Sequence, residues 1–74
     1  MNLLKKRAAK KLLEKRKRER ELLREDIENL EAEIRRTETI FNLTTDEYLL
    51  ESAIFERNAQ NAKMNYLLRL AKEI

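Results

Sequence analysis

The chain has 74 residues, of which 42% are charged, and its formal net charge is +3. It contains no Cys and no His, which excludes disulfides and thiolate chemistry and removes the commonest general base and metal ligand. It also contains no Gly and no Pro, and a composition rich in Ala, Glu, Lys, Leu and Arg is typical of long helices or a coiled coil.

The charge is divided unevenly along the chain. Residues 1–20 hold ten Lys or Arg against two Glu, which leaves a net charge of +8. Residues 21–74 hold seven Lys or Arg against twelve Asp or Glu, which leaves −5. The sequence therefore predicts a basic arm, residues 1–20, attached to an acidic body, residues 21–74.

A heptad pattern begins just after the basic arm. Its positions alternate steps of four and three residues, as in a coiled coil: Leu23, Ile27, Leu30, Ile34, Thr37 and Phe41. This pattern predicts a first helix over residues 3–41, about 58 Å long at 1.5 Å per residue. The basic arm is expected to continue that helix.

Residues 40–48 form the one stretch where the helical pattern stops and restarts. Asn42 enters the left-handed conformation that ends many helices at a lower cost than most residues. We therefore predict a turn at residues 42–44 and a second helix over residues 45–73. The alternative is one continuous helix, because no Gly or Pro forces a break.

The start of the second helix has two further signals. Thr44 and Glu47 have the spacing of a capping box, in which the threonine oxygen accepts the Glu47 N–H. Leu43 could pack on Tyr48 as a hydrophobic staple. Both features favour a helix that begins immediately after the predicted turn.

Folding the second helix back on the first defines a register. Its predicted pairs are Ile34 with Phe55, Leu30 with Ala59, Ile27 with Ala62, and Leu23 with Tyr66. Large residues then face small ones at the centre, so that the helices can approach closely. In this register Ile74 falls beside Glu14, and the basic arm projects beyond the hairpin.

Four apolar residues of the second helix would remain exposed in a single hairpin: Leu50, Ile54, Met64 and Leu68. Each contributes about 1.5–3 kcal/mol when fully buried, so we expect an oligomer or partner interface there. The expected fold is all-α: an antiparallel two-helix coiled-coil hairpin with a basic N-terminal helical extension. We expect it to self-associate as a homodimer, with a four-helix bundle as the simplest closure, or as a higher oligomer.

Residues 40–73 resemble the YaaL-like family, short cytoplasmic proteins of Gram-positive bacteria with no assigned activity. The residues that carry the resemblance are Phe41, Asn42, Thr44, Asp46, Glu47, Leu49, Ala53, Ile54, Phe55, Glu56, Ala59, Ala62, Tyr66, Leu67, Leu68, Arg69, Ala71 and Lys72. The resemblance implies a helical hairpin of unknown function. It adds no catalytic chemistry, and it does not cover the basic arm.

Catalytic chemistry has little support in the sequence. Ser52 is the only serine, and it has no histidine to activate it. Metal sites in helical bundles use Glu-x-x-His pairs, and the numerous carboxylates are most simply a solvated helix face. We predict no catalytic residues, no metal site and no cofactor, and hence a protein that is not an enzyme.

The basic arm is the strongest polar signal. Its cations are dense enough to neutralise several phosphates: Lys5, Lys6, Arg7, Lys10, Lys11, Lys15, Arg16, Lys17, Arg18 and Arg20. No aromatic residue lies among them, so contacts to nucleic acid would be directed at the backbone. RNA, DNA and an acidic protein surface are all compatible. A membrane surface is disfavoured because the apolar face is narrow and has no Trp or Phe anchor, and a merely solvated extension is the remaining alternative.

These observations predict a non-enzymatic interaction protein whose basic arm binds an anionic partner such as RNA or DNA. The alternative is a protein–protein adaptor or regulatory subunit that docks through the apolar face of the second helix. The sequence has no apolar run of membrane-spanning length, and its basic N-terminal residues lack the apolar stretch of a secretory signal. A cytoplasmic location is therefore expected.

Overall fold

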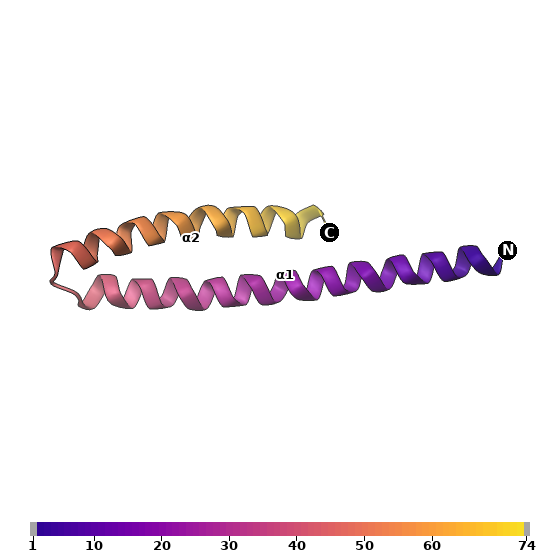
Figure 1. Cartoon of the computed structure of the whole chain (residues 1–74), viewed down its shortest axis with the longest axis horizontal. Helices are drawn as coiled ribbons and strands as arrows, with labels where there is room; N and C mark the ends of the chain where they lie inside the picture. The colour runs from indigo at the N-terminus through magenta and orange to yellow at the C-terminus, as the bar shows by residue number, and fades with distance from the viewer. Residues whose placement is uncertain (1, 74) are drawn as a thin grey trace.

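The computed structural model describes residues 2–73. These residues form two α-helices, α1 (Leu3–Leu43) and α2 (Glu47–Glu73), and no strand. The helices lie side by side and run antiparallel in a molecule measuring 67 × 15 × 14 Å (Figure 1). The predicted all-α helical hairpin is confirmed.

Helix α1 is unbroken along its whole length. Asn2 caps its start, because the Asn2 Oδ1 accepts the Leu4 N–H at 3.0 Å and the Asn2 carbonyl accepts the Lys5 N–H at 3.1 Å. No Gly or Pro interrupts the chain, so nothing ends the helix before Leu43. The helix therefore ends two residues later than the sequence predicted.

Residues 44–46 connect the two helices. Thr44 leaves the helix with extended backbone angles (φ −81°, ψ 143°) while its N–H still donates to the Ile40 carbonyl. Asp46 is the N-cap of α2: its Oδ1 accepts the Leu49 N–H at 2.8 Å, and its carbonyl accepts the Leu50 N–H at 3.0 Å. A carboxylate is among the best acceptors for this position and also suits the positive end of the helix dipole.

Three details of the predicted turn are wrong. Asn42 lies inside α1, and no residue in the described part of the chain has a positive φ. The Thr44 Oγ1 accepts the Asp46 N–H at 3.1 Å, so Asp46 rather than Thr44 caps α2. Leu43 and Tyr48 are both highly exposed, which excludes the staple. An extended Thr44 ends the helix without the left-handed residue that we expected at Asn42.

The core is small and lies between the two helices. Leu23, Leu30 and Leu67 form its buried cluster, and four half-buried residues pack against it: Ile27, Ile34, Met64 and Leu70. The α1 residues of this core are those of the predicted heptad pattern. On α2, the residues that face α1 also alternate steps of three and four, and we call them the inner seam: Leu50, Ala53, Arg57, Gln60, Met64 and Leu67.

The predicted register is wrong because α2 turns a different face toward α1. Phe55, Ala59 and Ala62, which were expected to meet the first helix, are exposed. Tyr66 lines a hollow with its predicted partner Leu23 but is 50% exposed. Ala53, Gln60 and Leu67 are buried instead. Both faces of α2 have heptad spacing, so periodicity alone could not choose between them.

A buried polar pair identifies the actual register. The Gln60 Nε2 donates to the Thr37 Oγ1 at 2.8 Å, and the Thr37 hydroxyl donates to the Glu33 carbonyl at 3.1 Å. Thr37 is 2% exposed and Gln60 is 5% exposed. Burying either polar side chain without a partner is costly, so the single polar position of the α1 pattern and the single amide of the inner seam are aligned.

Candidate functional site

The basic arm forms the first turns of α1 and has no second helix along most of its length. Every described residue from 2 to 22 is exposed. In Figure 1 the indigo and purple part of α1 extends far beyond the C-terminal end of α2. The end of α2 is level with the close of the arm, where Glu73 lines a shared hollow with Arg16, Glu19 and Arg20.

The ten predicted cations therefore fall into two groups. Six lie on the free part of α1, residues 3–15: Lys5, Lys6, Arg7, Lys10, Lys11 and Lys15. Four follow in the last part of the arm: Arg16, Lys17, Arg18 and Arg20. Of these, Arg16 and Arg20 line a hollow with Glu73 at the end of α2. The free part holds one acidic residue, Glu14, so that its net charge is +5.

The free part of α1 is a helix under electrostatic strain. Its first turn has no acidic residue, while Lys5 and Lys6 place positive charge at the positive end of the helix dipole. Like charges also meet one helical turn apart, for example Lys6 with Lys10 and Arg7 with Lys11. Each such pair destabilises a helix by about 0.2–0.5 kcal/mol. A bound anion would relieve all of these repulsions together.

The four predicted interface residues divide between two environments. Met64 packs against the core, and Leu50 is half-buried on the inner seam. Ile54 and Leu68 remain exposed, at 43% and 46%. The prediction that all four form one free face is therefore wrong for Leu50 and Met64, because α2 is rotated relative to the expected register.

The large apolar residues of α2 that are most exposed lie outside the inner seam, and Tyr66 among them lines a hollow with Leu22 and Leu23 of α1. Tyr48 is 80% exposed, Phe55 67% and Tyr66 50%. The sequence interpretation assigned these aromatics to the hairpin core. Two features of the sequence indicate the correct side of α2. Ala53, Gln60 and Leu67 are spaced seven residues apart, and Gln60 can form a hydrogen bond with Thr37, the one polar residue of the α1 pattern.

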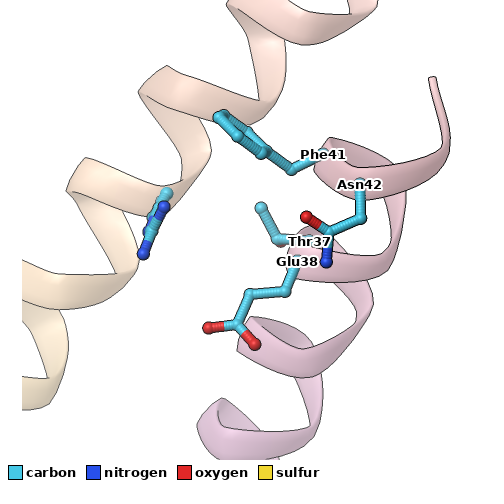
Figure 2. Close-up of a pocket in the computed structure, with 5 residues that line it drawn as sticks. Thr37, Glu38, Phe41 and Asn42 are labelled. Carbon is cyan, nitrogen blue, oxygen red and sulfur yellow. The ribbon is translucent and has the colours of Figure 1, made fainter. Parts of the chain in front are cut away.

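Near the turn, the structure brings together a cation and an aromatic ring. The Arg57 guanidinium carbon lies 5.8 Å from the centre of the Phe41 ring, a distance suited to a cation–π contact. The two side chains border a hollow of about 170 Å³ that Thr37, Glu38 and Asn42 also line. Figure 2 shows Phe41 and Glu38 on α1 with Thr37 between them.

The hollows of the hairpin are small and open. Five of them have volumes of about 170, 170, 280, 320 and 270 Å³. Sites for small molecules have volumes of about 300–1,000 Å³ and enclose most of their ligand. Of these five, the hollow at the turn, lined by Ile40, Leu43 and Leu49 among others, reaches this range, and its lining is mostly apolar. The most distinctive chemistry of the molecule is therefore on its surface.

Two further classes of site were sought in residues 2–73. No group of three or more Asp or Glu side chains there is placed to hold a metal ion. Neither helix, over the same residues, has a segment long and apolar enough to cross a membrane. The predictions that the chain is not an enzyme and needs no cofactor stay predictions.

Comparison with known proteins adds no relative. No protein-family model, no curated protein and no solved structure matches this chain. The resemblance of residues 40–73 to the YaaL-like family therefore stays a prediction.

Proposed function

We propose that this chain is a non-enzymatic interaction protein whose basic arm binds the anionic backbone of a nucleic acid. The observation that carries the proposal is the free helix over residues 3–15, which has six Lys or Arg, one Glu and no cover from α2. It is about 20 Å long at 1.5 Å per residue. Duplex DNA carries one negative charge per roughly 1.7 Å, so a helix of this length can neutralise several phosphates.

The distribution of these cations supports backbone contacts rather than base contacts. Lys5, Lys6 and Arg7 follow one another in the helix, so they point in three different directions. A helix in a groove would then meet phosphates on both walls of that groove. The arm has no aromatic residue to stack on bases, so we expect binding with little dependence on sequence.

The test is a salt-dependent titration of the full chain with a DNA duplex and with a structured RNA. If six phosphates are neutralised, the logarithm of the binding constant for duplex DNA falls with the logarithm of salt concentration with a slope of about −5. Deleting residues 2–15 removes the free helix but leaves Arg16, Glu19 and Arg20 beside Glu73. This deletion should weaken binding by roughly 100-fold or more at moderate salt.

A matched control shows whether binding depends on the charge of the arm or only on the net charge of the whole chain. The double substitution Arg35→Glu and Arg36→Glu lowers the net charge by four, whereas the deletion removes six Lys or Arg and one Glu and so lowers the net charge by five. Both arginines are exposed on the hairpin, so this variant should retain most of the binding. Equal losses in the two variants, or binding that ignores salt, would overturn the proposal. So would binding to anionic vesicles with none to either nucleic acid.

A second candidate function is favoured by the exposed aromatic residues of α2. In this alternative α2 docks on a different protein through Phe55 and its neighbours, and the basic arm is incidental. Deleting residues 2–15 would then leave partner binding unchanged, which distinguishes the two functions. Either function is consistent with the cytoplasmic location that we propose.

A further inference from the structure

Helix α2 has a second heptad pattern on the side that faces away from α1. Its members are separated by steps of four, three, four, three and four residues, and we call them the outer seam: Tyr48, Ser52, Phe55, Ala59, Ala62 and Tyr66. Every one of these side chains is exposed. Because Ala53, Gln60 and Leu67 are buried against α1, the heptad geometry places most of the outer seam on the opposite side of α2. Tyr66, at its end, lies on the flank of the hairpin and lines a hollow with Leu22 and Leu23 of α1.

The hairpin alone leaves much apolar surface unburied. Its buried apolar residues in the described chain are Leu23, Leu30, Ala53 and Leu67, which is little for a chain of this size. Given their exposures, the three aromatics of the outer seam would bury roughly 600–1,000 Å² in total across two copies. The small side chains between them, Ser52, Ala59 and Ala62, are also exposed, and they raise this area toward the low end of the roughly 1,200–2,000 Å² of a specific interface.

We propose that the outer seam binds a second copy of this chain, with the two α2 helices antiparallel about a two-fold axis near Arg57. This pairing is self-complementary, as an isologous interface requires. It sets Phe55 against Ala59 of the second copy and Ser52 against Ala62 of the second copy, so that a small residue occupies each central layer. Tyr48 and Tyr66 of opposite copies then close the two ends.

Electrostatics favours this arrangement over a parallel one. Helix α2 holds four acidic and four basic residues, so that two copies can pack together without net repulsion. The basic arms, each with a net charge of +8, project from opposite ends of an antiparallel dimer. A parallel dimer would place them side by side, where like charges repel. The outer seam is independent of the nucleic-acid proposal, since it uses no residue of the arm.

Sedimentation velocity of the full chain over a concentration series tests the interface. The chain should sediment as a dimer, and Ala59→Glu should raise its dissociation constant by on the order of 100-fold or more, because a charge would be buried in a central layer. Asn58→Glu is the matched control: Asn58 is exposed, adjacent, and outside both seams. A wild-type monomer at all concentrations, or equal effects of the two substitutions, would overturn the proposal.

Cysteine cross-linking tests the arrangement even if Ala59→Glu prevents folding. The chain has no cysteine of its own, and Ser52→Cys and Ala62→Cys are both small changes on an exposed surface. A mixture of the two variants should form a mixed disulfide on mild oxidation, because those positions face each other. Ser52→Cys alone should not, since its two copies would lie about 15 Å apart along the helices. Efficient cross-linking of Ser52→Cys to itself would indicate a parallel dimer and contradict the proposal.

Discussion

The two parts of α1 are one continuous helix with different means of support. Leu12 and Leu30 are the same residue type in the same helix, yet Leu12 is 49% exposed and Leu30 is 2% exposed. Between Leu23 and Leu43 the helix is stabilised by packing against α2. Between residues 3 and 15 it depends on helix propensity and on the Asn2 cap alone. Continuity of a helix therefore does not imply uniform stability, and the less stable part is the one with surface available for a partner.

The largest expected effect on stability comes from truncating the same side chain in the two parts. Leu30→Ala should lower the free energy of unfolding by about 2–5 kcal/mol, because it leaves a cavity in a core cluster of three residues. Leu12→Ala should change it by less than about 0.5 kcal/mol. Urea denaturation at one fixed protein concentration measures both. Equal effects would mean that the arm is packed in solution.

The next largest effect concerns the buried polar pair. Thr37→Val should destabilise the hairpin by about 1–3 kcal/mol, because the buried Gln60 amide loses its 2.8 Å bond to Thr37 and keeps only the 3.5 Å contact with the Glu56 Oε1. The matched control is Thr39→Val: Thr39 is exposed, and its hydroxyl makes the same kind of bond, to the Arg35 carbonyl at 3.0 Å. That variant should stay within about 0.5 kcal/mol of the wild type.

A double substitution shows whether the two side chains act as a pair. Thr37→Val with Gln60→Leu replaces both polar groups and should recover most of the stability lost in Thr37→Val. The Gln60 Oε1 is already buried without a partner, so the leucine variant also removes an unsatisfied acceptor. Additive losses in a double-mutant cycle would contradict the pairing of Thr37 with Gln60.

The smallest effect separates the two helix caps. Asp46→Ala removes the acceptor of the Leu49 N–H at the start of α2 and should lower the free energy of unfolding by about 1 kcal/mol. Asn2→Ala removes the equivalent acceptor at the start of the arm. It should reduce helicity by circular dichroism without moving the main thermal transition. A shift of that transition by Asn2→Ala would show that the arm unfolds together with the hairpin.

The sequence predicts the elements of this fold better than their mutual orientation. The heptad positions from Leu23 to Thr37 and the existence of a turn follow from local patterns. The orientation of α2 does not, because its inner and outer seams both repeat every seven residues. Tyr48, Phe55 and Tyr66 made the outer seam look like the core side, since aromatics usually contribute most to apolar burial. The inner seam, in contrast, contains the polar residues Gln60 and Arg57. Their contacts with Thr37 and Phe41 explain why this side of α2 faces α1.

The candidate site was predictable to a different extent in its two halves. The cations of the basic arm follow directly from the sequence, and α1 leaves all of them exposed. Their division at Arg16 depends on where α2 ends, and hence on the register. Leu50 and Met64 were assigned to a free surface for the same reason, since each residue's exposure depends on the rotation of α2.

Because the Thr44–Asp46 connection is short, the entropic cost of forming a contact between the helices increases with the distance of that contact from the turn. Forming a contact closes a loop, and the conformational entropy lost grows with the logarithm of the loop length. The Thr37–Gln60 bond spans only 23 positions of sequence, whereas the cluster that joins Leu30 to Leu67 closes a longer loop. The end of the hairpin nearest the turn is therefore the end with the lower closure cost. We therefore expect the helices to pair from the turn toward the arm, since the contacts nearest the turn are the most local in sequence.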